Sequence, residues 1–258
     1  MNGLCSDVIL EVMNFLDQEE IHSSVFKKYI ADHTRQRTAL STIHNAVDLE
    51  LARMYPKADY DLFVYTLEMY YELEDADYPR VVRLTSSIQP PPFFTNLQYL
   101  NISHSHFTFS LPPELSGLKE LNCSHTPLLK LPNEYTQLVH LDASHSRVYE
   151  IPEAYVLLET LNVYGSRVSR LSPLYTKLRE LNCGNTHVGE IPDSYSNLER
   201  LDCRLSLVKR IPPTLLKLKW IDCSNSRVDH VPEVIRRLPL TFFREKSMFQ
   251  LNYFLSIQ

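Results

Sequence analysis

A twenty-residue pattern is repeated seven times in succession between residues 97 and 238 of this 258-residue chain. It reads Leu-x-x-Leu-(Asn/Asp)-x-x-x-(Ser/Thr)-x-Val-x-x-Ile-Pro-x-x-(Tyr/Leu)-x-x. Its opening leucines are Leu97, Leu118, Leu138, Leu158, Leu178, Leu198 and Leu218, and Leu238 begins an eighth unit that does not continue. A fixed period in this range predicts a solenoid, because one unit cannot bury its apolar side alone and must stack on its neighbours.

Each unit starts with the alternation of a strand that has one buried face. In the second unit, Leu121 and Cys123 are apolar and alternate with the polar Glu120 and Asn122, as the period of two requires. The Cys123 column is small or apolar throughout: Ile102, Cys123, Ala143, Val163, Cys183, Cys203 and Cys223. We therefore expect its cysteines to be buried free thiols and not a disulfide framework.

The second half of each unit carries turn chemistry. A hydroxyl column follows the strand: Ser105, Thr126, Ser146, Ser166, Thr186, Ser206 and Ser226. Such short side chains can hydrogen-bond the backbone where the chain turns away from the strand. A proline then stands in six of the seven units, for example Pro132, and it predicts an extended limb and no full helix, because proline fixes φ and lacks an N–H.

These seven consecutive units resemble a leucine-rich repeat array of the short, twenty-residue kind, over more than half of the chain. In the hydroxyl column, serine or threonine replaces the family's customary asparagine, which bears on the turn geometry. The resemblance implies an α/β solenoid with parallel β-strands on the concave face and an extended or short-turn convex side. It also implies binding and not catalysis.

We expect four segments along the chain. Residues 1–80 carry helical spacing at 43–56 and 59–74 and predict an all-helical N-terminal block. Residues 81–96 predict a lead-in strand and a proline-rich joint. The repeats follow at 97–238, and residues 239–258, which are rich in aromatic and aliphatic side chains, predict a C-terminal cap over the last strand.

The N-terminal residues 4–30 can be interpreted in two ways. A pair of amphipathic helices would cap the open end of the solenoid, which otherwise exposes a strand edge. The segment also resembles an F-box, although Cys5 stands in place of the usual proline and Tyr29 in place of tryptophan. That resemblance implies docking to a Skp-type adaptor through apolar residues: Leu4, Val8, Ile9, Val12, Phe15 and Leu16.

An F-box followed by leucine-rich repeats implies the substrate-recognition subunit of a cullin-type ubiquitin ligase, with no catalysis in this chain. The alternative is a binding scaffold, or a bacterial or viral effector, whose N-terminal helices only cap the solenoid. The sequence shows no signal peptide and no apolar run long enough to span a membrane, so we expect the cytoplasm, or the host cytoplasm for an effector.

The distribution of charge along the sequence indicates which classes of partner to expect. The formal net charge is −5, with −8 over residues 1–80 and +3 over residues 81–258. An acidic first part and acidic residues among the arginines of the repeats argue against nucleic-acid binding. No nucleophile–base pair, glycine-rich phosphate loop or carboxylate dyad stands out, so we expect no enzyme and no cofactor.

The outward strand positions predict the binding face. A nearly uniform column of asparagine and aspartate, for example Asn122, predicts a structural ladder along the stack. Two variable columns predict partner contacts, and they supply the candidate partner-binding residues: His140, Tyr164, Arg200, Arg204 and Trp220. Aromatic and arginine side chains in one concavity are typical of a binding hot spot. The alternative is an Arg/Trp cation–π pair that only covers surface.

Two further columns carry residue types that bind metal ions or phosphates in other proteins. The histidine column comprises His104, His125 and His145, and the arginine column comprises Arg147, Arg167 and Arg227. We expect no metal site, because no cysteine or carboxylate at ligand spacing accompanies the histidines. We expect no phosphate-binding stripe, because acids such as Glu150 and Glu190 separate the arginines.

Overall fold

The computed structural model describes residues 42–43, 61–64, 73, 78–87, 89–106 and 110–244. The chain divides into two compact units, residues 1–82 and 83–258. The six residues expected to dock an adaptor, and the whole segment 4–30, lie outside the described residues.

The described part of the first unit contains strands and one turn of helix. Strand β1 (Thr42–Ile43) pairs in parallel with β2 (Asp61–Val64), with Ile43 opposite Leu62. A 3-10 helix, η1, covers Tyr78–Arg80. The prediction of an all-helical block is therefore wrong at β1 and β2. Their β-branched and aromatic residues favour a strand, and the nineteen-residue step from Ile43 to Leu62 is close to the period of the repeats.

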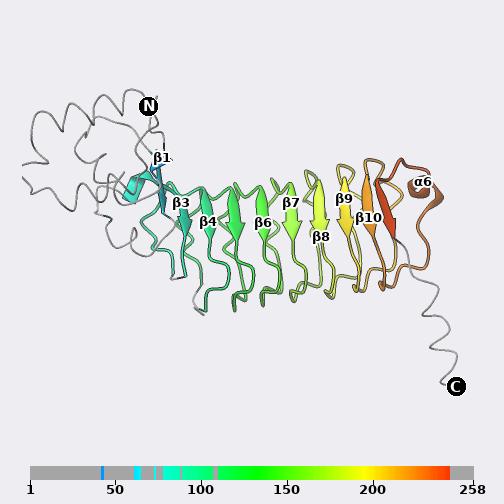
Figure 1. Cartoon of the computed structure of the whole chain (residues 1–258), viewed down its shortest axis with the longest axis horizontal. Helices are drawn as coiled ribbons and strands as arrows, with labels where there is room; N and C mark the ends of the chain where they lie inside the picture. The colour runs from blue at the N-terminus through cyan, green and yellow to red at the C-terminus, as the bar shows by residue number, and fades with distance from the viewer. Residues whose placement is uncertain are drawn as a thin grey trace, which may run out of the picture. The chain divides into compact units, whose positions relative to one another are not determined.

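The second unit is a parallel sheet whose strands follow one another in sequence order (Figure 1). Its strands are β3 (Val81–Thr85) from Arg83 onward, β4 (Tyr99–Asn101), β5 (Glu120–Asn122), β6 (His140–Asp142), β7 (Thr160–Asn162), β8 (Glu180–Asn182), β9 (Arg200–Asp202), β10 (Trp220–Asp222) and β11 (Phe242–Arg244). The predicted parallel-strand solenoid of seven units is confirmed in β4 to β10, where equivalent residues of successive units lie opposite each other.

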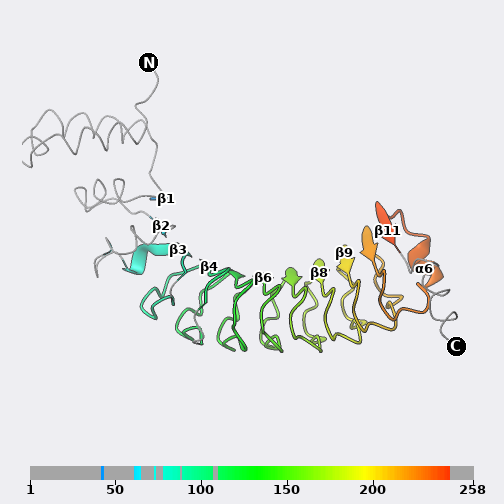
Figure 2. The same cartoon turned by 60° about the horizontal axis from the view of Figure 1, so that its bottom comes forward.

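The strands line the inner side of the arc that this unit forms, and the connecting limbs lie on its outer side (Figure 2). The outer limbs consist of turns up to residue 232 and contain one short helix, α6 (Glu233–Arg236). This confirms the expected extended or short-turn convex side. β3 lies where the lead-in strand was expected, and β11 adds one more strand in register beside β10 where the repeat pattern itself had faded.

The core consists of columns of identical or similar side chains stacked at each repeat. Leu121, Leu141 and Leu161 are at most 2 % exposed, and the valine and isoleucine columns of the outer limb are also buried. Four cysteines are buried in the column where the alternation predicts them. Burial raises the pKa of the Cys123, Cys183 and Cys203 thiols well above the ordinary value, so they act as small apolar side chains.

Serine and threonine hydroxyls organise the turn after each strand, as predicted. The hydroxyl of Thr126 donates to the Cys123 carbonyl oxygen at 2.6 Å, and the hydroxyl of Ser146 donates to the Ala143 carbonyl oxygen at 2.6 Å. The Ser146 oxygen also accepts the Val148 N–H at 3.3 Å. One hydroxyl thereby satisfies two backbone groups and fixes where the chain leaves the sheet.

A column of tyrosines ties successive outer limbs together. The side chains of Tyr135, Tyr155, Tyr175 and Tyr195 are fully buried. Each hydroxyl donates to a carbonyl oxygen of the preceding repeat; Tyr135 reaches Pro112 at 2.8 Å and Tyr195 reaches Ser172 at 2.8 Å. Burial raises the pKa of all four hydroxyls well above the ordinary value, so they remain donors at any physiological pH.

Replacing Tyr195 by phenylalanine tests the contribution of one such tie. The ring would still fill its site, but the buried Ser172 carbonyl would lose its donor at 2.8 Å. We expect the free energy of unfolding to fall by about 1–2 kcal/mol, measured by urea denaturation. Tyr149→Phe is the matched control, because Tyr149 is 38 % exposed; an equal loss in both variants would contradict a specific role for the tie.

Candidate binding face

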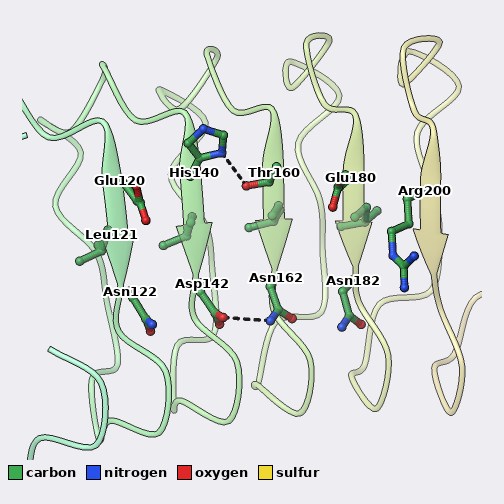
Figure 3. A pocket seen from close by; sticks show the side chains of 13 residues that line it. Glu120, Leu121, Asn122, His140, Asp142, Thr160, Asn162, Glu180, Asn182 and Arg200 are labelled. Carbon is green, nitrogen blue, oxygen red and sulfur yellow. Dashed lines mark hydrogen bonds between the residues drawn. The ribbon is translucent and has the colours of Figure 1, made fainter. Parts of the chain in front are cut away.

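The concave face carries a groove that crosses five consecutive strands. Its volume is about 620 Å³, and side chains from β5 to β9 line it. The first and third residues of each strand form two rows across the groove, as Figure 3 shows for Glu120 to Arg200 and for Asn122 to Asn182. The outward strand positions therefore face this concavity, as the alternation predicts.

The asparagine and aspartate row mainly shapes the backbone. The Oδ1 atom of Asn122 accepts the N–H of Ser124 at 3.0 Å, and the same bond recurs from Asn101 to Asp222. Of the ladder predicted along the stack, one side-chain step is found in the described part of the chain, from Asn162 Nδ2 to Asp142 Oδ2 at 3.1 Å. The uniformity of this row therefore reflects a repeated turn within each unit more than a ladder between units.

Arg200 and Trp220 form one contact at the C-terminal end of the face. The guanidinium carbon of Arg200 lies 3.8 Å from the centroid of the Trp220 ring, and the two residues are opposite each other in β9 and β10. Arg200 is exposed, whereas Trp220, expected to be exposed, is half-buried. The cation–π pair that the sequence left open is thus present.

Tyr164 and Arg204 form a second contact, which spans two repeats. The guanidinium carbon of Arg204 lies 5.4 Å from the Tyr164 ring centroid, and the residue between them in this column is Gly184. A Cβ atom on Gly184 would lie 2.9 Å from Tyr164 Cδ2 and 3.0 Å from the Arg204 carbonyl oxygen. The missing side chain at Gly184 is what lets the ring and the guanidinium meet.

His140 lies apart from these two pairs. Its Nδ1 atom is 2.9 Å from the hydroxyl oxygen of Thr160 on the next strand (Figure 3). Of the five predicted partner-binding residues, His140 and Arg200 line the groove. The five together make three separate contacts, and their role in binding stays a prediction.

Two buried carboxylates, those of Asp202 and Asp222, lie at the C-terminal end of the repeats. Asp202 and Asp222 are 5 % and 2 % exposed. Burial raises the pKa of Asp202, aided by the charge of Asp222 and opposed by the Arg204 N–H and guanidinium. Arg204 Nε lies 3.4 Å from Asp202 Oδ2, and it is buried with no hydrogen-bond acceptor in the described part of the chain.

Three charged residues that precede the strands form a network at the rim. Glu199 accepts hydrogen bonds from Lys219 at 2.5 Å and from Arg179 at 2.7 Å, and these bonds lower the pKa of Glu199 to about 2. This network was not predicted from the sequence, although its three residues have alternating charge and stand at twenty-residue steps.

The histidine column lies at the turn that follows the strands. His104, His125 and His145 have φ values of 52–59°, a left-handed conformation in which histidine is enriched among non-glycine residues. Their exposed rings stack at centroid distances of 4.4 and 4.6 Å. Within the residues that the structure describes, no group of three or more potential ligands is placed to hold a metal ion.

Comparison with known proteins agrees with this architecture. The model of the family described as Leucine Rich Repeat matches residues 96–118. The fold is that of a leucine-rich repeat solenoid. No curated protein matches the chain at a significant level.

Solved structures show the same fold at low sequence identity. The functional domain of InlJ from Listeria monocytogenes, described as including a cysteine ladder, has a TM-score of 0.61 and 18 % identity, over 73 % of this chain and 47 % of that one. The plant peptide hormone receptor RGFR1 in complex with RGF2 has a TM-score of 0.56 and 22 % identity, over 73 % of this chain and 35 % of that one. An internalin C2 from L. monocytogenes has a TM-score of 0.55 and 16 % identity, over 68 % of this chain and 84 % of that one.

The chain thus spans less than half of the InlJ chain and about a third of the RGFR1 chain. In the described part of the structure, none of the helices is both long and apolar enough to cross a membrane.

Gly184→Ser tests whether the contact between Tyr164 and Arg204 depends on the missing side chain at Gly184. Serine occurs in the same column of the repeat at Ser144. The added Cβ would overlap the Tyr164 ring at 2.9 Å, so we expect a loss of about 1–3 kcal/mol in the free energy of unfolding. Part of this loss should vanish in the Tyr164→Ser background, which removes the ring and leaves the 3.0 Å approach to the Arg204 carbonyl oxygen. Additive losses in the double variant would show that Gly184 and Tyr164 are not coupled.

Proposed function

We propose that this chain is a non-enzymatic scaffold that holds a segment of a protein partner in the groove of its concave face. One observation carries the proposal: five consecutive strands present two rows of mostly polar side chains to a hollow of about 620 Å³. The strands set these side chains in fixed positions, and a preorganised surface binds without a large ordering cost.

The length of the groove suits an extended polypeptide. Five parallel strands about 4.8 Å apart span about 19 Å, which is the length of about six extended residues. The similar structure is that of a plant peptide hormone receptor, RGFR1, in complex with RGF2, and this supports a peptide as the partner of a solenoid with the same fold. His140 lines the groove that such a segment would occupy, and Arg200 stands at its C-terminal end.

Blocking the groove tests this proposal. We expect the full-length protein to enrich ligands from a display library of short random peptides, and Thr160→Trp to reduce their affinity at least about tenfold by filling the groove. Thr176→Trp is the matched control, because Thr176 is exposed on the outer limb. Peptides that bind Thr160→Trp as well as the natural protein would exclude the groove as their site.

A second candidate is the substrate-recognition subunit of a cullin-type ubiquitin ligase in the cytoplasm. It rests on the resemblance of residues 4–30 to an F-box, with Val12 and Leu16 on the apolar side of the expected helix. The rival is an effector or plain scaffold in which the same residues cap the repeats. In both cases the concave face would hold the partner.

A binding assay with a purified Skp-type adaptor separates these alternatives. If the F-box proposal is right, the full chain binds the adaptor and Val12→Asp/Leu16→Asp abolishes binding. Asn14→Asp adds a charge on the other side of the expected helix and should change little. No binding by the folded chain, or an equal effect of Asn14→Asp, would reject the ubiquitin-ligase role.

A further inference from the structure

We infer that the segment bound in the concave groove presents an oxyanion, a carboxylate or a phosphate, to Arg200 and Arg204. This inference rests on the proposed function, because it specifies the chemistry of the partner at the same face. It concerns the C-terminal end of the groove, which Arg200 of β9 lines, and the turn directly after β9, which carries Arg204 two residues beyond the strand.

Arg200 is held in position without using its donors. Its guanidinium carbon lies 3.8 Å from the centroid of the Trp220 ring, and the guanidinium makes no hydrogen bond or ion pair with any residue that the structure describes. A guanidinium stacked through its face keeps its N–H groups at its edge, where they match the two oxygens of a carboxylate or phosphate. Because the stacking already fixes the side chain, little freedom is lost on binding.

Arg204 supplies a second and incompletely used guanidinium. Tyr164 supports it across Gly184, and its side chain remains 43 % exposed. Its buried Nε atom lies 3.4 Å from Asp202 Oδ2. The exposed end of the guanidinium makes no hydrogen bond or ion pair with any residue in the described part of the chain, and its N–H groups there could donate to an incoming oxyanion.

The rest of the groove argues for a polypeptide and against a polyanion. Glu120, Asp142 and Glu180 line the groove on strands β5, β6 and β8, so a chain of phosphates would meet like charges over most of its length. A polypeptide can place one acidic group at β9 and neutral or basic groups over the acidic strands. The charge of the groove therefore favours an oxyanion at one end of the ligand.

The experiment uses peptides enriched by the full-length natural protein in the display selection. We expect them to share an acidic residue at a fixed position. Synthetic versions would carry glutamate, phosphoserine or glutamine there, with affinity measured by fluorescence polarisation. Glutamine should weaken binding by about tenfold to a hundredfold, and comparison of glutamate with phosphoserine identifies the source of the oxyanion.

Variants of the protein locate the oxyanion. The double variant Arg200→Gln/Arg204→Gln should bind the acidic peptide only as tightly as the natural protein binds the glutamine peptide. The double variant should bind the glutamine peptide with little further loss of affinity. Arg200→Lys/Arg204→Lys retains the charge and should recover part of the affinity. Arg167→Gln/Arg227→Gln removes the same charge from exposed positions outside the groove and should have little effect. Thermal unfolding would confirm that each variant folds.

Several outcomes would overturn the inference. Enriched peptides without a shared acidic residue, or equal losses in the Arg167/Arg227 control, would reject it; if Thr160→Trp still blocked those peptides, the proposed function would stand. Preferential binding of an RNA oligonucleotide would reject the polypeptide assignment. No enrichment at all, or binding that is indifferent to Thr160→Trp, would reject the proposed function together with the inference.

Discussion

The strands of this solenoid are too short to hold successive turns together by themselves. From β4 to β10 each strand has three residues, so the stack depends on bonds that continue beyond the sheet. The backbone pairing extends into the turn, where the N–H of Cys123 donates to the Asp142 carbonyl oxygen at 2.8 Å and the N–H of His125 to the Ser144 carbonyl oxygen at 2.9 Å. These bonds require the turn to have the same shape in each unit, which explains the conserved turn residues within this chain.

Exact stacking also determines what the concave face can do. Because equivalent positions of successive units lie opposite each other, residues twenty positions apart in sequence become neighbours in space. Arg200 therefore meets Trp220, and Tyr164 reaches Arg204 once Gly184 leaves the intervening place empty. A face built in this way combines a few exceptional side chains with a uniform frame, and the exceptions are where recognition can be specific.

The sequence predicts those features of the structure that depend on the period and on local chemistry. Strand positions, the buried cysteine column and the role of the hydroxyl column follow from alternation and turn propensity. The role of Gly184 could not be predicted, because the reach of Tyr164 over a neighbouring repeat depends on side-chain directions. The strands at Thr42–Ile43 and Asp61–Val64 were missed because short apolar runs fit helical and strand periods equally well, and the nineteen-residue step from Ile43 to Leu62 lies outside the seven regular repeats.

The buried tyrosine column joins some neighbouring repeats of the solenoid by hydrogen bonds and leaves others without this bond. Tyrosines join the units from Tyr135 to Tyr195, whereas Leu115 and Leu215 occupy the same column at either side and have no hydroxyl to donate. Local opening is easiest where fewer bonds must break. The buried tyrosine bonds cover the acidic strands of the groove, whereas the units of Arg200 and Trp220 are joined at the surface by the ion pairs of Glu199 with Arg179 and Lys219. Because salt screens exposed charges and leaves buried hydrogen bonds largely unchanged, the two ends of the groove should respond differently to ionic strength.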